Sequence, residues 1–229
     1  MRQLTTNWSL VIQRKILDIL RGTHIILIDY SLMPMTMTTE EKILKAALEL
    51  FVSKGFNTPT SEITKKAKVS SGILFHYFPA KDDLILTLYA NTLGEYYQSG
   101  FVQIDDEVMA DRTRFESNIR RAWSAIVQWG VSNWEKFQYM QQFENTPYLD
   151  KYQSRKSADI QRVQKYLAEE TKLAIEKGIS KDLPVDFLIR TGSGLIISTI
   201  KFLHENPKWR ESNEFMEQAL QMYLCANER

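Results

Sequence analysis

The sequence predicts an all-α protein with about nine helices after residue 37. In most segments beyond that point, apolar residues recur three, four, seven and eight positions apart, which is the spacing of one helix face. Capping residues, glycines and prolines separate these segments, as helix start and stop signals do. The one convincing strand-like run is THIILIDY at residues 23–30, and a lone strand is not stable without a partner.

The first 36 residues do not match the pattern of the rest of the chain. They hold the strand-like run and a short amphipathic stretch, SLVIQRKILDIL, and Met35 and Met37 stand just before the first strong helix signal. We expect residues 1–36 to be an extension of uncertain status. It is either a non-native or upstream-start segment or a genuine arm that packs on the body, and N-terminal sequencing of the protein from its own host distinguishes the two.

The composition is that of a globular protein, with 44% hydrophobic and 25% charged residues among 229. A net charge of +1 gives no general affinity for nucleic acid, so any basic surface must be local. The single cysteine, Cys225, excludes a disulfide within one chain and suits a reducing cytoplasm. No apolar run reaches the roughly 18 residues of a membrane span. We therefore expect a cytoplasmic protein without a membrane partner.

Patterns typical of enzymes are missing from the sequence. It has no P-loop, no dinucleotide-binding glycine pattern and no G-x-S-x-G motif. Its three histidines, His24, His76 and His204, lack ligand spacing with another His, Cys or carboxylate. We expect no catalytic residues, no metal and no cofactor. In TGSGL, at residues 191–195, close helix packing explains Gly192 and Gly194 better than a phosphate loop does.

Four helices are expected in the first part of the body. The first runs over 38–55, where Thr38 and Glu41 have the spacing of a capping box and Gly55 is the C-cap. A short helix capped by Thr60 or Ser61 follows. After a break at KVS comes a second short helix, SGILFHYF, ended by a proline. The fourth helix begins at about residue 80 and carries two aspartates in its first turn, where the helix dipole favours acids.

Five further helices follow a polar connector that begins after residue 100. We expect them at residues 114–134, 135–145, 152–178, 184–206 and 212–228. The third of them is one long amphipathic helix closed by Gly178, and the fourth carries Pro184 in its first turn.

The two short helices cannot bury their own faces and need the helix at 38–55 as a third. This arrangement is a helix-turn-helix, whose second helix lies in the DNA major groove. The residues spaced to pack inward are Ile63, Ala67, Val69 and Leu74; those left partly outside are Ser61, Lys65, Lys68, Ser71, Gly72, Phe75, His76 and Tyr77. Residues 38–85 contain seven lysines and six acidic residues. Three of the lysines, Lys65, Lys66 and Lys68, come just before the second short helix in the sequence. Without the motif, a solvated helix face is the better explanation of these lysines.

The stretch KAALELFVSKGFNTPTSEITKKAKVSSGILFHYFPAKDDL closely resembles the DNA-binding region of TetR-family transcriptional regulators, and the match spans residues 38–85. The resemblance implies a helix-turn-helix DNA-binding domain at 37–84 and an effector-binding and dimerisation domain at 85–229. Three positions depart from the family pattern: Phe75 replaces a frequent Tyr, Lys68 replaces a turn Gly, and the GFNTPT loop is one residue short. A non-Gly residue in a left-handed turn costs about 1–2 kcal/mol.

The resemblance also implies which residues contact DNA. They are Thr60, Ser61, Lys68, Ser70, Ser71, Gly72, Phe75, His76, Tyr77 and Lys81. Within this set Ser70, Ser71 and Gly72 open the recognition helix near phosphate, and Lys81 reaches the DNA backbone. We expect Ser71, Gly72 and His76 nearest the base edges, although a plain surface histidine is an alternative for His76.

Large aromatic rings are frequent over residues 115–152, and at helical spacing most such rings belong to a core. The family resemblance instead implies an effector cavity in this part of the chain. Its expected lining is Trp123, Ile126, Val127, Phe137, Met140, Gln141, Phe143 and Tyr152, with Gln142 as a further residue that could orient a ligand. Such a lining suits a small apolar or aromatic effector.

The family resemblance implies that the last two helices form the homodimer interface. Two helices from each protomer would pack there as a four-helix bundle. The candidate residues are Phe187, Leu195, Ile196, Thr199, Phe215, Leu220 and Tyr223.

The favoured function is a homodimeric repressor that a small-molecule effector releases from a palindromic double-stranded DNA operator. An activator or an effector-independent regulator shares this fold, and the sequence leaves it open. The alternative from another class is a helical small-molecule-binding protein or enzyme with a vestigial DNA-binding module. That alternative predicts ligand binding without salt-sensitive DNA affinity.

Overall fold

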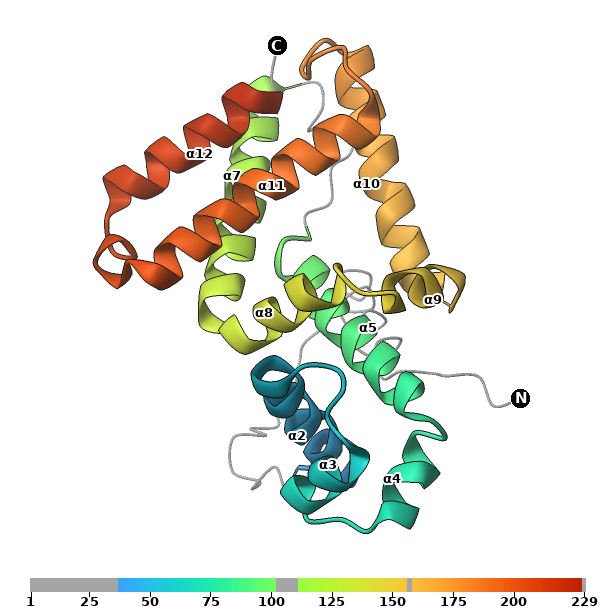
Figure 1. Cartoon of the computed structure of the whole chain (residues 1–229). Coiled ribbons are helices and arrows are strands. Elements are labelled where there is room, and N and C mark those ends of the chain that lie inside the picture. Colours follow the sequence, from blue (N-terminus) through green and yellow to red (C-terminus); the bar gives the residue numbers. More distant parts are fainter. Residues whose placement is uncertain (1–36, 102–110, 156–157, 228–229) are drawn as a thin grey trace, which may run out of the picture. The chain divides into compact units, whose positions relative to one another are not determined.

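The structure is a computed structural model of the 229-residue chain, and it describes residues 37–101, 111–155 and 158–227. These ranges contain ten α-helices and one 3-10 turn and no strand (Figure 1). The helices are α2 (Thr39–Lys54), α3 (Thr60–Ala67), α4 (Ser71–Tyr77), α5 (Lys81–Ser99), α7 (Arg112–Ser132), α8 (Trp134–Phe143), α9 (Tyr148–Arg155), α10 (Ala158–Glu176), α11 (Val185–Glu205) and α12 (Asn213–Asn227), with the 3-10 turn η2 at Pro207–Trp209. The all-α prediction is confirmed. The expectations for residues 1–36 lie outside the described residues.

The helix expected at 152–178 corresponds to two described segments, α9 and α10. Residues 156–157 between them lie outside the described residues, so whether one helix spans 152–178 stays a prediction. The described start is earlier than expected, since α9 begins at Tyr148. The predicted stop at Gly178 is confirmed, because this residue has a φ of 69° just after α10.

The start and end of α2 are as predicted. The Glu41 carboxylate accepts a hydrogen bond from the Thr38 N–H at 2.7 Å. In return the Glu41 N–H donates to the Thr38 hydroxyl at 3.2 Å, which completes the capping box. Gly55 ends the helix with a φ of 79°, a conformation that glycine adopts without strain.

The predicted cap of α3 is wrong. Pro59 is the N-cap residue and no side chain caps the helix, so Thr60 and Ser61 are its first two helical residues. The fixed φ of proline, here −65°, suits the extended approach to a helix. The helix therefore begins one residue before the hydroxyl pattern indicates.

The turn between α3 and α4 has the predicted left-handed residue. Lys68 has φ 56° and ψ 44°, and it is the one non-glycine residue with positive φ in the described chain. The Val69 N–H donates to the Thr64 carbonyl at 3.0 Å, and this bond satisfies an end-of-helix carbonyl and offsets part of the strain. Ser70 then caps α4, as predicted, by accepting from the Ile73 N–H at 3.2 Å.

Two larger hydrophobic cores and a smaller cluster of Phe115, Ala174 and Ile179 hold the described residues together. The first runs from α2, α3 and α4 through α5 into α8 and α9, and Phe51, Leu74 and Phe143 are fully buried in it. The second lies between α7, α8, α11 and α12, around Trp123 and Ile200. Helix α8 contributes to both cores, which places it between the DNA-binding region and the rest of the body.

Close packing between helices occurs at a glycine that the sequence did not single out. A Cβ on Gly130 of α7 would lie 2.5 Å from the Ile200 Cδ1 of α11, so these helices meet without space for a side chain there. At Gly194 a Cβ would meet nothing within 4 Å, so the described chain itself provides no close packing at this residue. Gly192 is buried on the same helix.

Candidate DNA-binding surface and ligand cavity

Helix α4 buries one side chain and exposes most of the others. Leu74 is fully buried and holds the helix against the first core. Ile73, Phe75 and Tyr77 are 42%, 45% and 42% exposed, and His76 is exposed beside them. Three large apolar side chains in the open on one short helix are typical of a surface that contacts a partner.

The structure places the predicted DNA-binding residues on α3, on α4, in the turn between them and at the start of α5. All ten are at least partly exposed: Thr60, Ser61, Lys68, Ser70, Ser71, Gly72, Phe75, His76, Tyr77 and Lys81. Lys81 is the first residue of α5, as predicted, and partial burial lowers its pKa. Ile73 was missed, although its place next to the buried Leu74 could have indicated an outward direction.

The three lysines beside the recognition helix do not behave alike. Lys66 forms an ion pair with Glu49 of α2 at 2.6 Å, so part of its charge is neutralised within the domain. Lys65 and Lys68 are exposed and form no ion pair among the described residues. These two, rather than all three, are the free cations of this surface.

Helix α8 and its neighbour α9 join the body to the DNA-binding region. The Tyr139 hydroxyl donates to the Ile85 carbonyl at 2.8 Å, and the Gln142 amide donates to the Val52 carbonyl at 3.2 Å. Burial raises the pKa of the Tyr139 phenol. The side-chain N–H of Gln142 therefore bonds within this junction, and Gln142 is not among the residues that line the cavity of the body.

Aromatic packing and ion pairs strengthen the same junction. The Phe56 ring, in the loop after α2, lies 5.5 Å from the Tyr139 ring and 5.7 Å from the Tyr148 ring. Lys151 of α9 pairs with Asp82 at 2.7 Å, at the start of α5. The pKa of the Asp82 carboxyl is lowered mainly by its hydrogen bond from Lys151.

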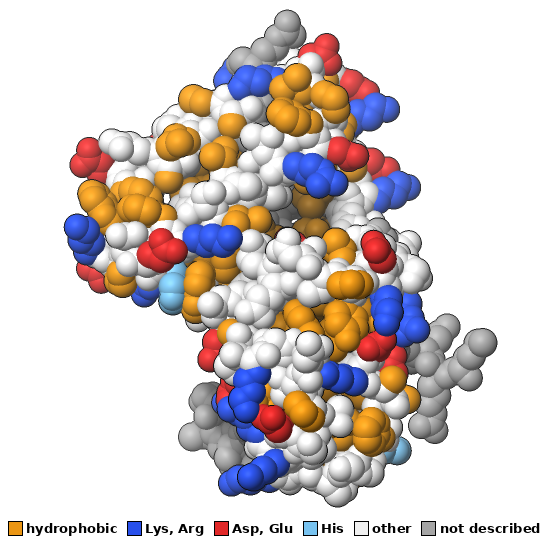
Figure 2. Space-filling view, viewed as in Figure 1, with side chains coloured by type: hydrophobic (Ala, Val, Ile, Leu, Met, Phe, Trp, Pro, Cys, Tyr) orange, Lys and Arg blue, Asp and Glu red, His pale blue; other side chains and the backbone are white. Residues whose placement is uncertain are grey.

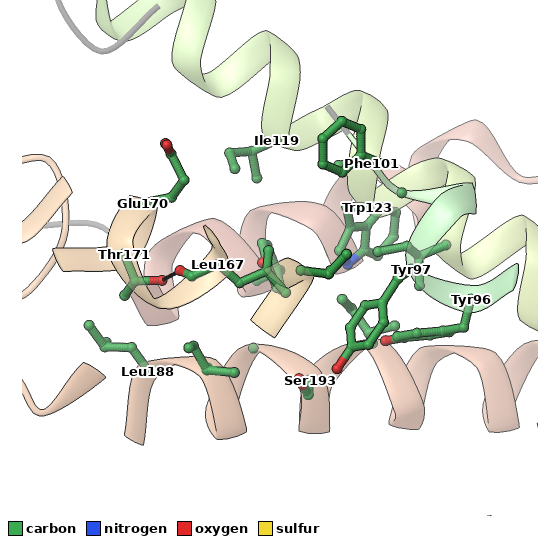
Figure 3. Close-up of a pocket in the computed structure, with 18 of the residues that line it drawn as sticks. Tyr96, Tyr97, Phe101, Ile119, Trp123, Leu167, Glu170, Thr171, Leu188 and Ser193 are labelled. Carbon is green, nitrogen blue, oxygen red and sulfur yellow. Dashed lines mark hydrogen bonds between the residues drawn. The ribbon is translucent and has the colours of Figure 1, made fainter. Parts of the chain in front are cut away.

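A cavity of about 350 Å³ lies within the body, lined by α5, α7, α8, α10, α11 and α12. Figure 3 shows Tyr96 and Tyr97 of α5, Trp123 of α7 and Leu167 of α10 around it. The surface is hollowed between α10 and α11, with hydrophobic side chains inside the hollow (Figure 2). The volume falls within the range of small-molecule sites.

Five of the eight predicted effector residues line this cavity. They are Trp123, Ile126, Phe137, Met140 and Gln141. Val127 is instead buried in the second core. Phe143 and Tyr152 pack around Tyr89 in the first core, with ring centroids 3.8 Å and 4.7 Å from it. Met140 and Phe143 lie three residues apart on α8 and are both buried in the first core, and Met140 also reaches the cavity.

Sequence reasoning missed the lining contributed by α5, α10 and α11. Tyr96 and Tyr97, Tyr166 and Leu167, and Ser193 are examples. The amphipathic pattern of α10 marked a buried face there, but nothing in the pattern distinguished a face that meets a cavity from one that meets a core.

The polar groups of the cavity are few. The indole nitrogen of Trp123 is buried and has no hydrogen-bond partner, while the residue as a whole is 2% exposed. Burial raises the pKa of Tyr96 and of Tyr97, and a hydrogen bond with Gln164 lowers that of Tyr97 by a smaller amount. Burial also raises the pKa of Glu144, against the opposing effect of Lys201.

The residues predicted for the dimer interface differ in exposure. Ile196, Thr199 and Leu220 are buried against their own chain, whereas Phe187 is 54% exposed. Leu195, Phe215 and Tyr223 are intermediate. Phe202 and Met222 add further exposed apolar surface on α11 and α12, at 37% and 64%.

Two further kinds of feature are absent from the described residues. No group of three or more His, Cys, Asp or Glu side chains there is placed to hold a metal ion. Within the same ranges, no helix combines the length and the apolar character needed to cross a membrane.

Comparison with known proteins locates the similarity in sequence at the N-terminal helices. The family model for bacterial regulatory proteins of the tetR family matches residues 43–88. The transcriptional regulator YuxN of Bacillus subtilis is 41% identical over 66 residues, which are 28% of this chain and 21% of that protein. QacR, a transcriptional regulator of Staphylococcus aureus, is 42% identical over 53 residues, 23% of this chain and 28% of QacR.

The similarity in fold extends much further. A structure assigned to the tetR family, from Shewanella sp. PV-4, superposes with a TM-score of 0.72 at 22% identity, over 84% of this chain and 100% of that one. In contrast, the aligned region spans between 21% and 47% of the length of four curated relatives. The body therefore shares its fold with these regulators but little of its sequence.

Proposed function

We propose that the chain is a TetR-family regulator, a homodimeric transcriptional repressor that a small molecule releases from its operator; the match of its N-terminal helices to the family model and its fold support this. The operator is palindromic double-stranded DNA, read in the cytoplasm. The protein acts by binding and not by catalysis. The proposed domains are the DNA-binding domain at 37–84 and the effector-binding and dimerisation domain at 85–229.

The observation that carries this proposal is the outward face of α4. Its buried Leu74 fixes the helix to the domain, and Phe75, His76 and Tyr77 remain exposed on it. The exposed cations Lys65 and Lys68 lie just before it in the chain. A helix held in this way by one apolar anchor can enter a major groove, while cations beside it contact phosphate.

The dimer is proposed to form through α11 and α12, which expose Phe187, Phe202 and Met222. Gly194 supports this assignment, since it is exposed and its Cβ position is open, as a close approach by a partner helix requires. Of the residues proposed earlier, Phe187, Leu195, Phe215 and Tyr223 offer surface to a partner. Two recognition helices related by the dimer axis would meet major grooves about 34–36 Å apart.

Release by an effector is proposed to act through α8. One side of this helix lines the cavity with Phe137 and Met140, and the other side bonds to the DNA-binding region through Tyr139 and Gln142. A ligand in the cavity can shift the recognition helices only if it binds the released state more tightly than the DNA-bound state.

The proposal is tested by selecting genomic fragments that the protein binds and measuring affinity for the selected duplex at two or more salt concentrations. We expect sequence-specific binding that weakens steeply with salt. Absence of specific binding at low salt would contradict the proposal and favour a small-molecule-binding protein with a vestigial module.

Lys81→Ala tests one phosphate contact within this proposal. We expect affinity to fall to a similar degree on all sequences and the salt slope to flatten by about one. Lys172→Ala is the matched control, because Lys172 is exposed on α10, in the proposed effector-binding domain. Unchanged salt dependence in Lys81→Ala would remove Lys81 from the DNA contact.

A further inference from the structure

We infer that the cavity takes a largely aromatic molecule without negative charge, whose hydrogen-bond acceptor meets the indole N–H of Trp123. The inference rests on the proposed function in one respect, since it takes this cavity to be the effector site. Beyond the proposed function, it specifies the charge of the ligand, the polar group that the ligand carries and the residue that recognises this group.

The first argument is the hydrogen-bond state of Trp123. Its side chain is almost completely buried, and its nitrogen has no acceptor within hydrogen-bond distance. Figure 3 shows this nitrogen on the side of the indole that faces the other lining side chains. A buried donor without a partner costs about 1–3 kcal/mol. A ligand that brings an acceptor to this position recovers that free energy.

The second argument is the apolar and aromatic character of the lining. Rings from α5, α7, α8, α10 and α12 and from the segment just after α5 surround the space: Tyr96, Tyr97, Phe101, Phe115, Trp123, Phe137, Tyr166 and Tyr223. Aromatic side chains pack favourably on planar ligands by stacking and by edge-to-face contacts. The cavity volume is about 350 Å³. A compact molecule of two or three fused rings suits this volume and the surrounding rings better than a long chain does.

The third argument is the sign of the charges. Among the described residues that line the cavity there is no Lys, Arg or His, whereas Glu144 and Glu170 both contribute. An anionic ligand would lose its hydration without gaining a cation, which is costly in an apolar site. At the Trp123 nitrogen itself the ligand presents an acceptor, because the N–H is the positive end of the local dipole.

Three probes that share a naphthalene ring separate these arguments by calorimetry. They are methyl 2-naphthoate, a neutral acceptor; 2-butylnaphthalene, a hydrocarbon of similar size; and the 2-naphthoate anion. With the full chain we expect the ester to bind about fivefold more tightly than the hydrocarbon, as one net hydrogen bond provides. We expect the anion to bind at least tenfold more weakly than the ester.

Trp123→Phe removes the donor and keeps an aromatic ring. We expect the advantage of the ester over the hydrocarbon to fall below twofold, while the hydrocarbon's affinity changes little. Trp209→Phe is the matched control, because Trp209 is 39% exposed on η2 and lies outside the lining. If Trp123→Phe does not fold, the wild-type protein still decides the question by NMR, since the Trp123 indole proton should move downfield with the ester and not with the hydrocarbon.

Several results would overturn the inference. They are equal binding of ester and hydrocarbon, tightest binding of the anion, an advantage of the ester that persists in Trp123→Phe, and no binding of any probe. Duplex binding is measured on the same preparations. Loss of salt-sensitive DNA binding with the ester preference intact would refute the proposed function alone, and the reverse result would refute this inference alone.

Discussion

The DNA-binding domain and the helical body use amphipathic helices in opposite ways. In the former, α4 buries Leu74 and turns Phe75 and Tyr77 outward. In the latter, α7 and α10 turn aromatic and aliphatic side chains inward and still leave about 350 Å³ unfilled. A surface that meets DNA can thus be formed by one short stretch of sequence. A cavity needs several helices that are distant along the chain.

The largest expected effect is a loss of stability in the DNA-binding domain. Leu74→Ala removes the apolar anchor of α4 from a fully buried position, and we expect a loss of about 2–5 kcal/mol in unfolding free energy. DNA affinity should fall at least tenfold, while ligand binding in the body persists below the unfolding transition. Urea unfolding and duplex binding measure the two effects.

Ile73→Ala is the control for Leu74→Ala, because the neighbouring side chain is 42% exposed. Its unfolding free energy should change by no more than about 0.5 kcal/mol. Equal destabilisation by the two variants would show that α4 is not held by Leu74.

The next effect concerns packing in the body. In Gly130→Ala the added Cβ meets Ile200 at 2.5 Å, so we expect a loss of about 1–3 kcal/mol from overpacking between α7 and α11. The paired variant Gly194→Ala meets no atom of its own chain, so in the dissociated protomer it should gain about 0.5–1 kcal/mol from its higher helix propensity. Thermal unfolding compares the two.

Gly194→Ala also sharpens the proposed dimer. If α11 approaches a partner helix closely at this residue, the variant should dissociate at higher protein concentration than the wild type, as sedimentation measures. An unchanged dimer would place Gly194 outside the interface.

A smaller effect is expected at the junction of the two regions. Tyr139→Phe deletes the hydrogen bond from the buried hydroxyl to the Ile85 carbonyl and should cost about 0.5–1.5 kcal/mol. Methyl 2-naphthoate should then lower DNA affinity less than it does in the wild type. Tyr77→Phe, at an exposed ring, should leave stability unchanged, and identical behaviour of both variants would argue against α8 as the connection.

The smallest effect is a pH dependence at α5 and α9. The hydrogen bond from Lys151 lowers the pKa of Asp82 below its ordinary 3.8. The stabilisation is therefore present above that pH and is lost as the pH falls through the lowered pKa. Because both side chains of the pair are largely exposed, solvent and salt screen it and its contribution to stability is small.

Asp82→Asn should remove this component of acid destabilisation between pH 5 and pH 2, as urea unfolding at each pH measures. Asp150→Asn, at an exposed residue of α9, should retain it. A wild-type acid profile in Asp82→Asn would mean that the ion pair contributes nothing to stability.

The local features of the fold could be predicted from the sequence because each depends on residues close together in the chain. The capping box at Thr38 and Glu41, the C-cap at Gly55 and the left-handed Lys68 are of this kind. So is the exposed face of α4, which follows from helical spacing around Leu74. The cap of α3 was mistaken because the geometry of Pro59 prevailed over the hydroxyl groups that follow it.

Tertiary structure alone decided which buried faces meet a cavity and which meet a core. Phe143 and Met140 lie three residues apart on α8, yet one packs on Tyr89 and the other lines the cavity. The sequence by itself determined the all-α class, the helix-turn-helix and its exposed residues, since these rest on local spacing. The cavity, the unpaired Trp123 N–H and the contact at Gly130 depend on how distant helices pack, and hydrophobic spacing carries no information about the partner against which a face packs.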